Sequence, residues 1–429
     1  MLEGILNGLL GLTDGVQALV TLGGLKQMVM LAIGGTLIFL GVKKDVEPLL
    51  LVPIGFGCLL VNIPGSELMH QGIDIGAKQV LDAMGPAAPE ALKAMAKDDT
   101  GFVRSIYNMG IANELFPLLI FIGIGAMTDF GPLLENPKIL LFGAAGQCGI
   151  FLTLLLALAL GFPHLEAVSI AVIGACDGPT AIYVASQYAP QLLGPISVAA
   201  YSYMALVPII QPPIMKALTT EKERETVMPV VKRSVSANTK LLFPIVVTVV
   251  TGLIAPKGLP LMASIMLGNF MRECGAVTRL TKASENEIAN IATLFLGIAI
   301  GATMAAEDFL KPTTLAIFAL GFVAICLDTI VGVGFGKIWY VLSGGRMNPL
   351  IGAAGISAFP MAARVVQAQG QRYNKKNFLL MHAMGANCGG QIGSVAAAAV
   401  MLSVLKGLGA VATRLAKRCS SSSCQSVCA

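Results

Sequence analysis

Long apolar segments make up most of the chain and are separated by short polar ones. They run for roughly 15 to 25 residues without the period-two alternation of a strand, which is the length that a membrane-spanning helix needs. We expect spans or half-spans near residues 27–42, 48–63, 115–127, 139–160, 167–188, 193–217, 241–254, 259–271, 288–304, 313–342, 351–363 and 379–405. The pattern predicts an all-α polytopic membrane protein with about ten to twelve spans or half-spans.

Composition supports a membrane protein. Apolar residues form 55% of the chain and charged residues only 12%, whereas about a quarter of the residues in a soluble domain are charged. Backbone groups in lipid must pair with one another, so such a chain spans as helices or as a closed barrel. The net charge of +5 is spread over the loops and indicates no nucleic-acid partner. We therefore expect a multi-pass protein of the plasma or inner cell membrane.

Polar stretches mark the organisation of the chain. Residues 65–112 and 218–240 interrupt the apolar pattern, and the second stretch is the most charged part of the sequence, which favours a cytoplasmic location. Residues 1–413 are expected to form a single transmembrane domain. Residues 414–429 are rich in serine and are expected to be a disordered tail.

A faint internal repeat relates residues 113–217 to residues 288–405. In each half a long apolar helix leads into a segment interrupted by glycine and proline: GACDGPTAIY at 174–183 and NPLIGAAGISAFPMAAR at 348–364. Interrupted hydrophobic segments at matching places of two halves are the sequence pattern of a transporter's midplane binding site. We predict two inverted-repeat halves with broken or re-entrant helices.

Asp177 is the most informative residue in the first interrupted segment. About ten apolar residues precede it, and a carboxylate at that depth costs on the order of 2.5 to 3.5 kcal/mol. Pro179 lacks an N–H, so the helix breaks here and frees backbone carbonyls that can join the carboxylate around a hard cation such as Na⁺. The alternative is a structural aspartate paired to a neighbouring helix.

The second interrupted segment combines neutral oxygens with a cation. Asn348 and Ser357 can offer oxygens to Na⁺, and the guanidinium of Arg364 suits a planar carboxylate. Arg364 could instead balance Asp177 or extend to the membrane surface.

Two later segments carry further polar groups. Tyr201 and Tyr203 lie two residues apart on one predicted helix, so at most one should line the site. Near the end, MHAMGANCGGQIGS places Asn387, Gln391 and Ser394 among small residues that favour close helix packing. The chain has no GxSxG, P-loop or HExxH motif, so any chemistry must use these few polar groups.

Five strings together resemble one known family. They are FIGIGAMTDFGPLLENPK (121–138), GACDGPTAIYVASQYAPQLLG (174–194), AAYSYMALVPIIQPPIMKALTTEKER (199–224), NPLIGAAGISAFPMAARV (348–365) and NFLLMHAMGANCGGQIGS (377–394). They resemble the β subunit of the biotin-dependent Na⁺-translocating decarboxylases, the oxaloacetate, methylmalonyl-CoA and glutaconyl-CoA enzymes. The resemblance covers nearly the whole chain to about residue 405.

The resemblance implies an enzyme that works within a complex. Its β subunit removes CO₂ from carboxybiotin, moves Na⁺ outward and consumes a proton. The implied partners are an α carboxyltransferase subunit, a biotin carrier subunit or domain, a small single-span γ subunit and further copies of the chain itself.

The family's functional residues map onto this sequence one by one. Asp177 resembles the family's coupling carboxylate, and Tyr203 resembles the tyrosine that transfers the proton. Arg364 resembles the group that meets the carboxyl of carboxybiotin, and Ser357 is the second residue implied to contact this cofactor. The implied Na⁺ ligands are Asp177, Asn348, Gly352, Ser357 and Asn387. Among them, Asn348, Gly352 and Ser357 resemble the family's second ion site and its backbone.

Some features depart from the family pattern or leave alternatives open. Cys176, Cys388 and Gly389 stand where we expect alanine, valine and alanine, all small or medium apolar sites. The polar stretch 65–112 is shorter than in the oxaloacetate enzymes, which favours a CoA-ester enzyme. A secondary Na⁺-coupled carboxylate symporter is the main alternative function, and a noncatalytic scaffold is the second.

Overall fold

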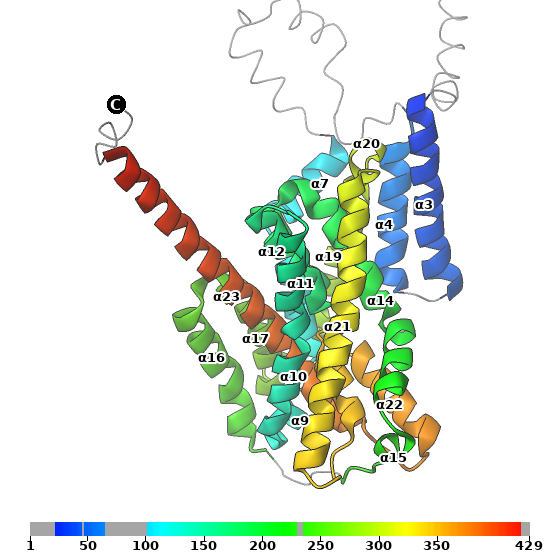
Figure 1. Cartoon of the computed structure of the whole chain (residues 1–429), viewed down its shortest axis with the longest axis vertical. Helices are drawn as coiled ribbons and strands as arrows, with labels where there is room; N and C mark the ends of the chain where they lie inside the picture. The colour runs from blue at the N-terminus through cyan, green and yellow to red at the C-terminus, as the bar shows by residue number, and fades with distance from the viewer. Residues whose placement is uncertain (1–21, 45–46, 65–100, 230–234, 422–429) are drawn as a thin grey trace, which may run out of the picture.

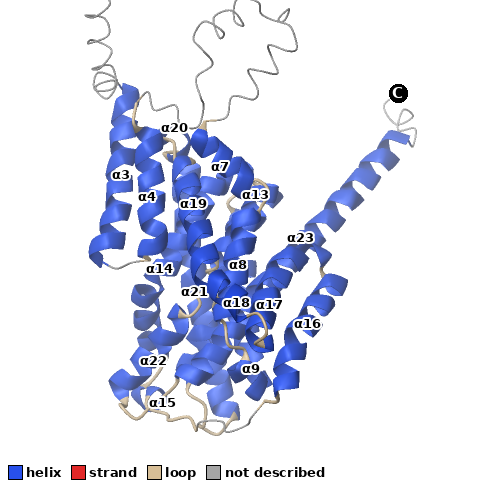
Figure 2. Cartoon of the chain, turned by 180° about the vertical axis from the view of Figure 1, so that it is seen from behind, coloured by secondary structure: helices blue, strands red, loops and turns tan. Residues whose placement is uncertain are grey.

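The computed structural model describes residues 22–44, 47–64, 101–229 and 235–421. Within these ranges every regular element is a helix, as Figure 2 shows by colour. Five helices are long and apolar enough to cross a membrane, and six if α7 (Phe102–Gly110) and α8 (Leu115–Met127), bent by 58°, count as one span. The predicted all-α multi-pass membrane protein is confirmed. Other predicted spans are shorter or interrupted helices.

The helices pack as one bundle (Figure 1). The remaining elements that the argument uses are α3 (Leu22–Lys44), α4 (Pro48–Asn62), α10 (Leu140–Gly146), α11 (Cys148–Ala159), α12 (His164–Ala171), η3 (Val172–Ala175), α13 (Gly178–Tyr188), α14 (Leu193–Leu218), α15 (Glu221–Arg224), α16 (Ala237–Ile254), α17 (Leu259–Cys274), α19 (Ala289–Ala302), α21 (Pro312–Leu342), η7 (Pro349–Gly355), α22 (Met361–Tyr373) and α23 (Leu380–Ser421). The short elements α9 (Gly131–Glu135), α18 (Thr278–Ala283) and α20 (Ala306–Phe309) connect them.

Small residues allow the closest helix contacts. Gly57 of α4 and Gly301 of α19 lie against each other's backbone, and Gly125 of α8 meets Gly268 of α17 in the same way. Helices in lipid gain little from apolar burial alone, so such close approaches supply much of their packing energy. The long helix α21 packs against α14, α11 and η7 and so joins the two interrupted regions.

Both predicted interruptions exist. η3 ends at Ala175 and α13 begins at Gly178, while η7 ends at Gly355 and α22 begins at Met361. The inverted symmetry of the halves 113–217 and 288–405 stays a prediction.

Three predicted polar regions lie partly outside the described residues. Residues 65–100 are not described, and the 218–240 stretch is described apart from residues 230–234. α15 begins in that stretch with a capping box of Thr220 and Glu223. α23 is helical to Ser421 and so includes the start of the predicted tail; the division into residues 1–413 and a disordered tail 414–429 stays a prediction.

Candidate functional site

Asp177 lies buried in the first break, 3% exposed. Cys176 before it has the left-handed backbone conformation (φ 52°, ψ 38°), which costs a non-glycine residue on the order of 1 to 3 kcal/mol. This turn ends η3 and leaves Asp177 extended at the N-cap of α13. Its Oδ2 accepts hydrogen bonds from the hydroxyls of Thr180 at 2.5 Å and Ser394 at 3.2 Å. Neutral donors therefore hold the carboxylate, and no lysine or arginine of the described ranges forms a salt bridge with it.

Ser357 lies in the second break, which contacts the first. Its backbone N–H donates to the carbonyl oxygen of Ala175 at 3.3 Å, and its hydroxyl donates to the carbonyl oxygen of Gly390 at 2.8 Å. We call the meeting place of residues 175–177 and 355–357 the crossing. It joins two segments that are far apart in the sequence.

One face of α23 covers the crossing. Asn387, Gln391 and Ser394 follow at intervals of four and three residues, so they point to the same side of the helix. The side-chain amide of Asn387 donates to the carbonyl oxygen of Ile356 at 2.6 Å, and that of Gln391 donates to the carbonyl oxygen of Ser357 at 2.5 Å. With the Ser394 bond to Asp177, this single face contacts both breaks.

Gln147 reaches the crossing from the turn between α10 and α11. Its Nε2 lies 3.2 Å from the carbonyl oxygen of Gly355, 3.3 Å from that of Gly390 and 3.4 Å from the Ser357 hydroxyl. A third amide side chain is therefore fixed here through its nitrogen.

The oxygens of these three amides are left without donors. Gln147 Oε1, Asn387 Oδ1 and Gln391 Oε1 are buried and have no hydrogen-bond partner among the residues that the structure describes. A buried polar atom without a partner costs about 1 to 3 kcal/mol. Carboxylate and amide oxygens are ligands for hard cations. One buried carboxylate beside several neutral oxygens suits a monovalent cation such as Na⁺. The described residues contain no group of three His, Cys, Asp or Glu side chains that could hold a metal ion.

Comparison with known proteins fits this chemistry. The family described as "Na+-transporting oxaloacetate decarboxylase beta subunit" matches residues 26–405. The methylmalonyl-CoA decarboxylase subunit beta of Propionigenium modestum is 50% identical over 378 residues, which cover 88% of this chain and 94% of that protein. The oxaloacetate decarboxylase beta chain of Klebsiella pneumoniae is 46% identical over 412 residues, which cover 88% of this chain and 95% of that protein. The chain belongs to this family.

Membership of the decarboxylase β-subunit family confirms the resemblance seen in the sequence. The chain is a membrane subunit of a Na⁺-transporting decarboxylase, so it is part of a complex with other subunits. A further β subunit, the methylmalonyl-CoA decarboxylase subunit beta of Veillonella parvula, is 48% identical over 377 residues, covering 88% of this chain and 92% of that protein.

The structure brings some of the predicted site residues of this β subunit together. Asp177, Ser357 and Asn387 meet at the crossing. Asn348 is buried at the start of η7, where its Nδ2 donates to the carbonyl oxygens of Arg224 and Thr226, both at 2.9 Å. Asn348 thus binds the charged loop that follows α14.

Gly352, Tyr203 and Arg364 lie elsewhere. Gly352 packs on α21, where a Cβ would collide with the carbonyl oxygen of Gly332. The Tyr203 hydroxyl donates to the carbonyl oxygen of Phe318 in α21 at 2.5 Å. Arg364 is exposed in the second turn of α22, in contrast to the buried residues of the crossing.

Tyr201, which the sequence left open, packs on the first break. A Cβ at Gly178 would collide with its ring, and its buried hydroxyl has no hydrogen-bond partner in the described structure. The sequence reasoning also missed Gln147 as a site residue. A signal existed, because Gln147 is the only strongly polar side chain in the apolar segment 139–160.

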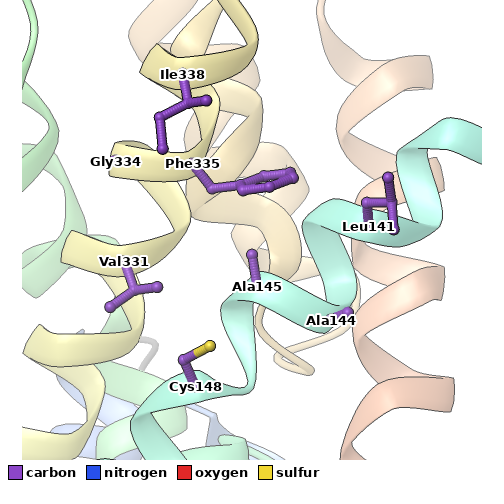
Figure 3. Close-up of a pocket in the computed structure, with 8 residues that line it drawn as sticks. All are labelled: Leu141, Ala144, Ala145, Cys148, Val331, Gly334, Phe335 and Ile338. Carbon is purple, nitrogen blue, oxygen red and sulfur yellow. The ribbon is translucent and has the colours of Figure 1, made fainter.

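An apolar groove of 550 Å³ lies between α10, α11 and α21 (Figure 3). Ala145, Cys148 and Gly334 are among the residues that line it. Its side chains offer no carboxylate, amide or hydroxyl oxygen, so the groove does not have the ligands of an ion site.

Proposed function

We propose that this β subunit removes CO₂ from carboxybiotin and carries Na⁺ outward in the same cycle, with the uptake of one proton. The crossing is the observation that carries the proposal. There a buried carboxylate without a cationic partner among the described residues, Asp177, lies where two broken helices meet. Three amide side chains fixed at the same crossing have oxygens without a donor among the described residues. Helix breaks that meet at a carboxylate suit an ion that must bind and leave in each cycle.

Decarboxylation breaks the bond between the carboxyl carbon and a ureido nitrogen of biotin. CO₂ leaves, and the nitrogen keeps the electron pair and takes a proton. In this proposal Arg364 binds the carboxylate before the bond breaks, with Ser357 as a second contact, and Tyr203 passes the proton. The exposure of Arg364 supports its part, because a biotin on a partner's carrier must reach it from outside this chain.

Coupling follows if the crossing cannot hold Na⁺ and a proton together. Asp177 is neutralised by Na⁺ in one state and by a proton in the other. Loss of CO₂ removes the negative charge that Arg364 binds, so the relative free energies of the two states change. The ligands of Na⁺ in this proposal are Asp177, Ser357 and Asn387, with Gln147 and Gln391 added from the geometry. The resemblance also implies Asn348 and Gly352, but these two residues lie outside the crossing and are not ligands of this site.

The proposed partners are an α carboxyltransferase subunit, a biotin carrier, a single-span γ subunit and further copies of this chain. We propose a CoA ester as the substrate of the complex. The alignment to the Klebsiella oxaloacetate chain runs over 412 residues for 88% of this chain, whereas the two methylmalonyl-CoA alignments run over 378 and 377 residues for the same share. The oxaloacetate chain therefore carries insertions within the aligned region that the methylmalonyl-CoA relatives lack. Comparing turnover of methylmalonyl-CoA with that of oxaloacetate tests this choice.

The main experiment follows decarboxylation of free carboxybiotin and ²²Na⁺ uptake together in liposomes that contain the complex. We expect Asp177→Asn to abolish both activities. Asp129→Asn is the matched control, because Asp129 is 42% exposed and ion-paired to Lys240 and Arg272 outside the crossing; it should retain both. If ²²Na⁺ moves without carboxybiotin, the chain is a secondary symporter. If Asp177→Asn keeps both activities, the chain is a scaffold.

A further inference from the structure

Asp328 is a second carboxylate buried in the membrane region, and nothing above uses it. It lies in the middle of α21 and is 0% exposed. Its Oδ1 accepts the backbone N–H of Gly149 at 2.7 Å, at the start of α11. Its Oδ2 is buried and has no hydrogen-bond partner in the described part of the chain. A Cβ at Gly149 would collide with the carboxylate, so the close approach of the two helices depends on glycine.

The groups around Asp328 are few. Thr153 follows Gly149 by one turn of α11, and its buried hydroxyl also has no partner. Cys148 of α11 and Cys176 after η3 are the titratable side chains that face it. Lys337, the only basic residue of α21, pairs with Glu223 instead, and no salt bridge to Asp328 is formed by the residues that the structure describes.

Asp328 lies beside both broken segments. An ideal Cβ on Gly174 of η3 comes within 3.4 Å of Oδ2, and Gly174 precedes Asp177 by three residues. Cys176 lies within electrostatic reach of both carboxylates. One turn after Asp328 on α21, Gly332 packs against Gly352 of η7. Asp328 is therefore packed close to the elements that form the crossing without being part of it.

The geometry favours a proton as the neutralising species. An unpaired carboxylate is strongly disfavoured in a membrane interior, so Asp328 must bind a cation or a proton. A hard cation takes about six oxygens, whereas the only buried side-chain oxygens without a partner in the described residues of α11 and α21 are Asp328 Oδ2 and the Thr153 hydroxyl.

We propose that Asp328 is a proton-binding site inside the membrane that holds the proton consumed in each decarboxylation and passes it toward the crossing. The inference rests on the proposed function. The proton leaves the Asp328 carboxyl and ends on the ureido nitrogen that has lost CO₂, and Asp328 takes up the next proton from the side to which Na⁺ is released.

The test compares wild type, Asp328→Asn and Thr329→Val in the reconstituted complex across a range of pH. Asparagine keeps an acceptor for the Gly149 N–H but cannot donate a proton. We expect the decarboxylation rate of Asp328→Asn to fall by roughly 100-fold or more, with loss of the alkaline limb of the pH profile. The Na⁺ concentration for half-maximal rate should stay within about twofold, because the crossing is intact. Thr329→Val should match wild type in rate and pH profile, because Thr329 donates within its own helix to Ile325.

Two outcomes overturn the inference. A wild-type rate and pH profile in Asp328→Asn makes Asp328 a permanently neutral structural acid. A raised Na⁺ requirement with an unchanged pH profile makes it a cation site. Failure of the proposed function is a different result, since wild type itself would then move Na⁺ without carboxybiotin.

Infrared difference spectra of the wild-type complex give a test that does not depend on assembly of Asp328→Asn. Turnover should change the C=O band of a protonated carboxyl group, and Thr153→Val should shift that band. Absence of the band overturns the inference.

Discussion

The hydroxyl of Ser394 donates a hydrogen bond to Oδ2 of Asp177 at 3.2 Å, across 217 residues of sequence. Thr180, in the first turn of α13, donates to the same oxygen. One donor therefore belongs to the first break and the other to α23, which also contacts the second break. In the function proposed above, movement between the two breaks would change the hydrogen bonds that stabilise the charge of Asp177, and with them its preference for Na⁺.

Replacing Ser394 tests this link. A hydrogen bond to a charged group contributes about 1.5 to 3 kcal/mol, so we expect Ser394→Ala to raise the Na⁺ concentration for half-maximal decarboxylation at least about tenfold. Ser169→Ala is the control, because the buried Ser169 hydroxyl donates within its own helix to Leu165. An unchanged Na⁺ requirement in Ser394→Ala contradicts a role for this bond in ion binding.

The two tyrosines of α14 should respond differently to loss of the hydroxyl. Tyr201→Phe removes a buried hydroxyl without a partner, so thermal stability should hold or rise and turnover should stay within about twofold. Tyr203→Phe removes the bond to Phe318 and the proposed proton donor, so turnover should fall at least about 100-fold. Turnover lost in Tyr201→Phe and kept in Tyr203→Phe would assign the proton step to Tyr201.

Two glycines of α21 form a matched pair for packing. A Cβ on Gly332 would collide with the carbonyl oxygen of Gly352, whereas a Cβ on Gly334 meets no atom within 4 Å. We expect Gly332→Ala to destabilise the protein by about 1 to 3 kcal/mol and Gly334→Ala to stabilise it by about 0.5 to 1 kcal/mol. Thermal unfolding of the purified subunit complex measures both. Equal melting temperatures would argue against close packing of α21 on η7.

The sequence predicts the part of the site that depends on local pattern. A lone carboxylate beside Gly178 and Pro179 in an apolar run identifies Asp177, and the glycines and prolines that interrupt residues 348–364 identify the second break. Gln147 could not be assigned, because its partners lie 208 to 243 residues away. Asp328 carries the lone-carboxylate signal as well, but no glycine–proline break follows it.

For Asn348 the sequence predicted too much. Its residue type suits an ion ligand, but its side chain contacts the loop after α14 and not the crossing. Its amide and that of Asn377 donate to the same two acceptors, the carbonyl oxygens of Arg224 and Thr226. Asn348→Ala and Asn377→Ala should therefore act alike. Each should destabilise the complex by roughly 1 to 3 kcal/mol and change the half-maximal Na⁺ concentration by less than about twofold.

Thermal melts and Na⁺ titrations of the two variants measured side by side decide between a loop contact and an ion site. Because Asn377 lies outside both breaks, its variant reports the cost of releasing the 224–226 loop alone. If Asn348→Ala raises the Na⁺ requirement while Asn377→Ala does not, Asn348 is a ligand of the second ion site that the resemblance implies. Its Oδ1, which now accepts the backbone N–H of Leu350 at 3.0 Å, is then the atom that meets the ion, and its nitrogen can stay bound to the loop.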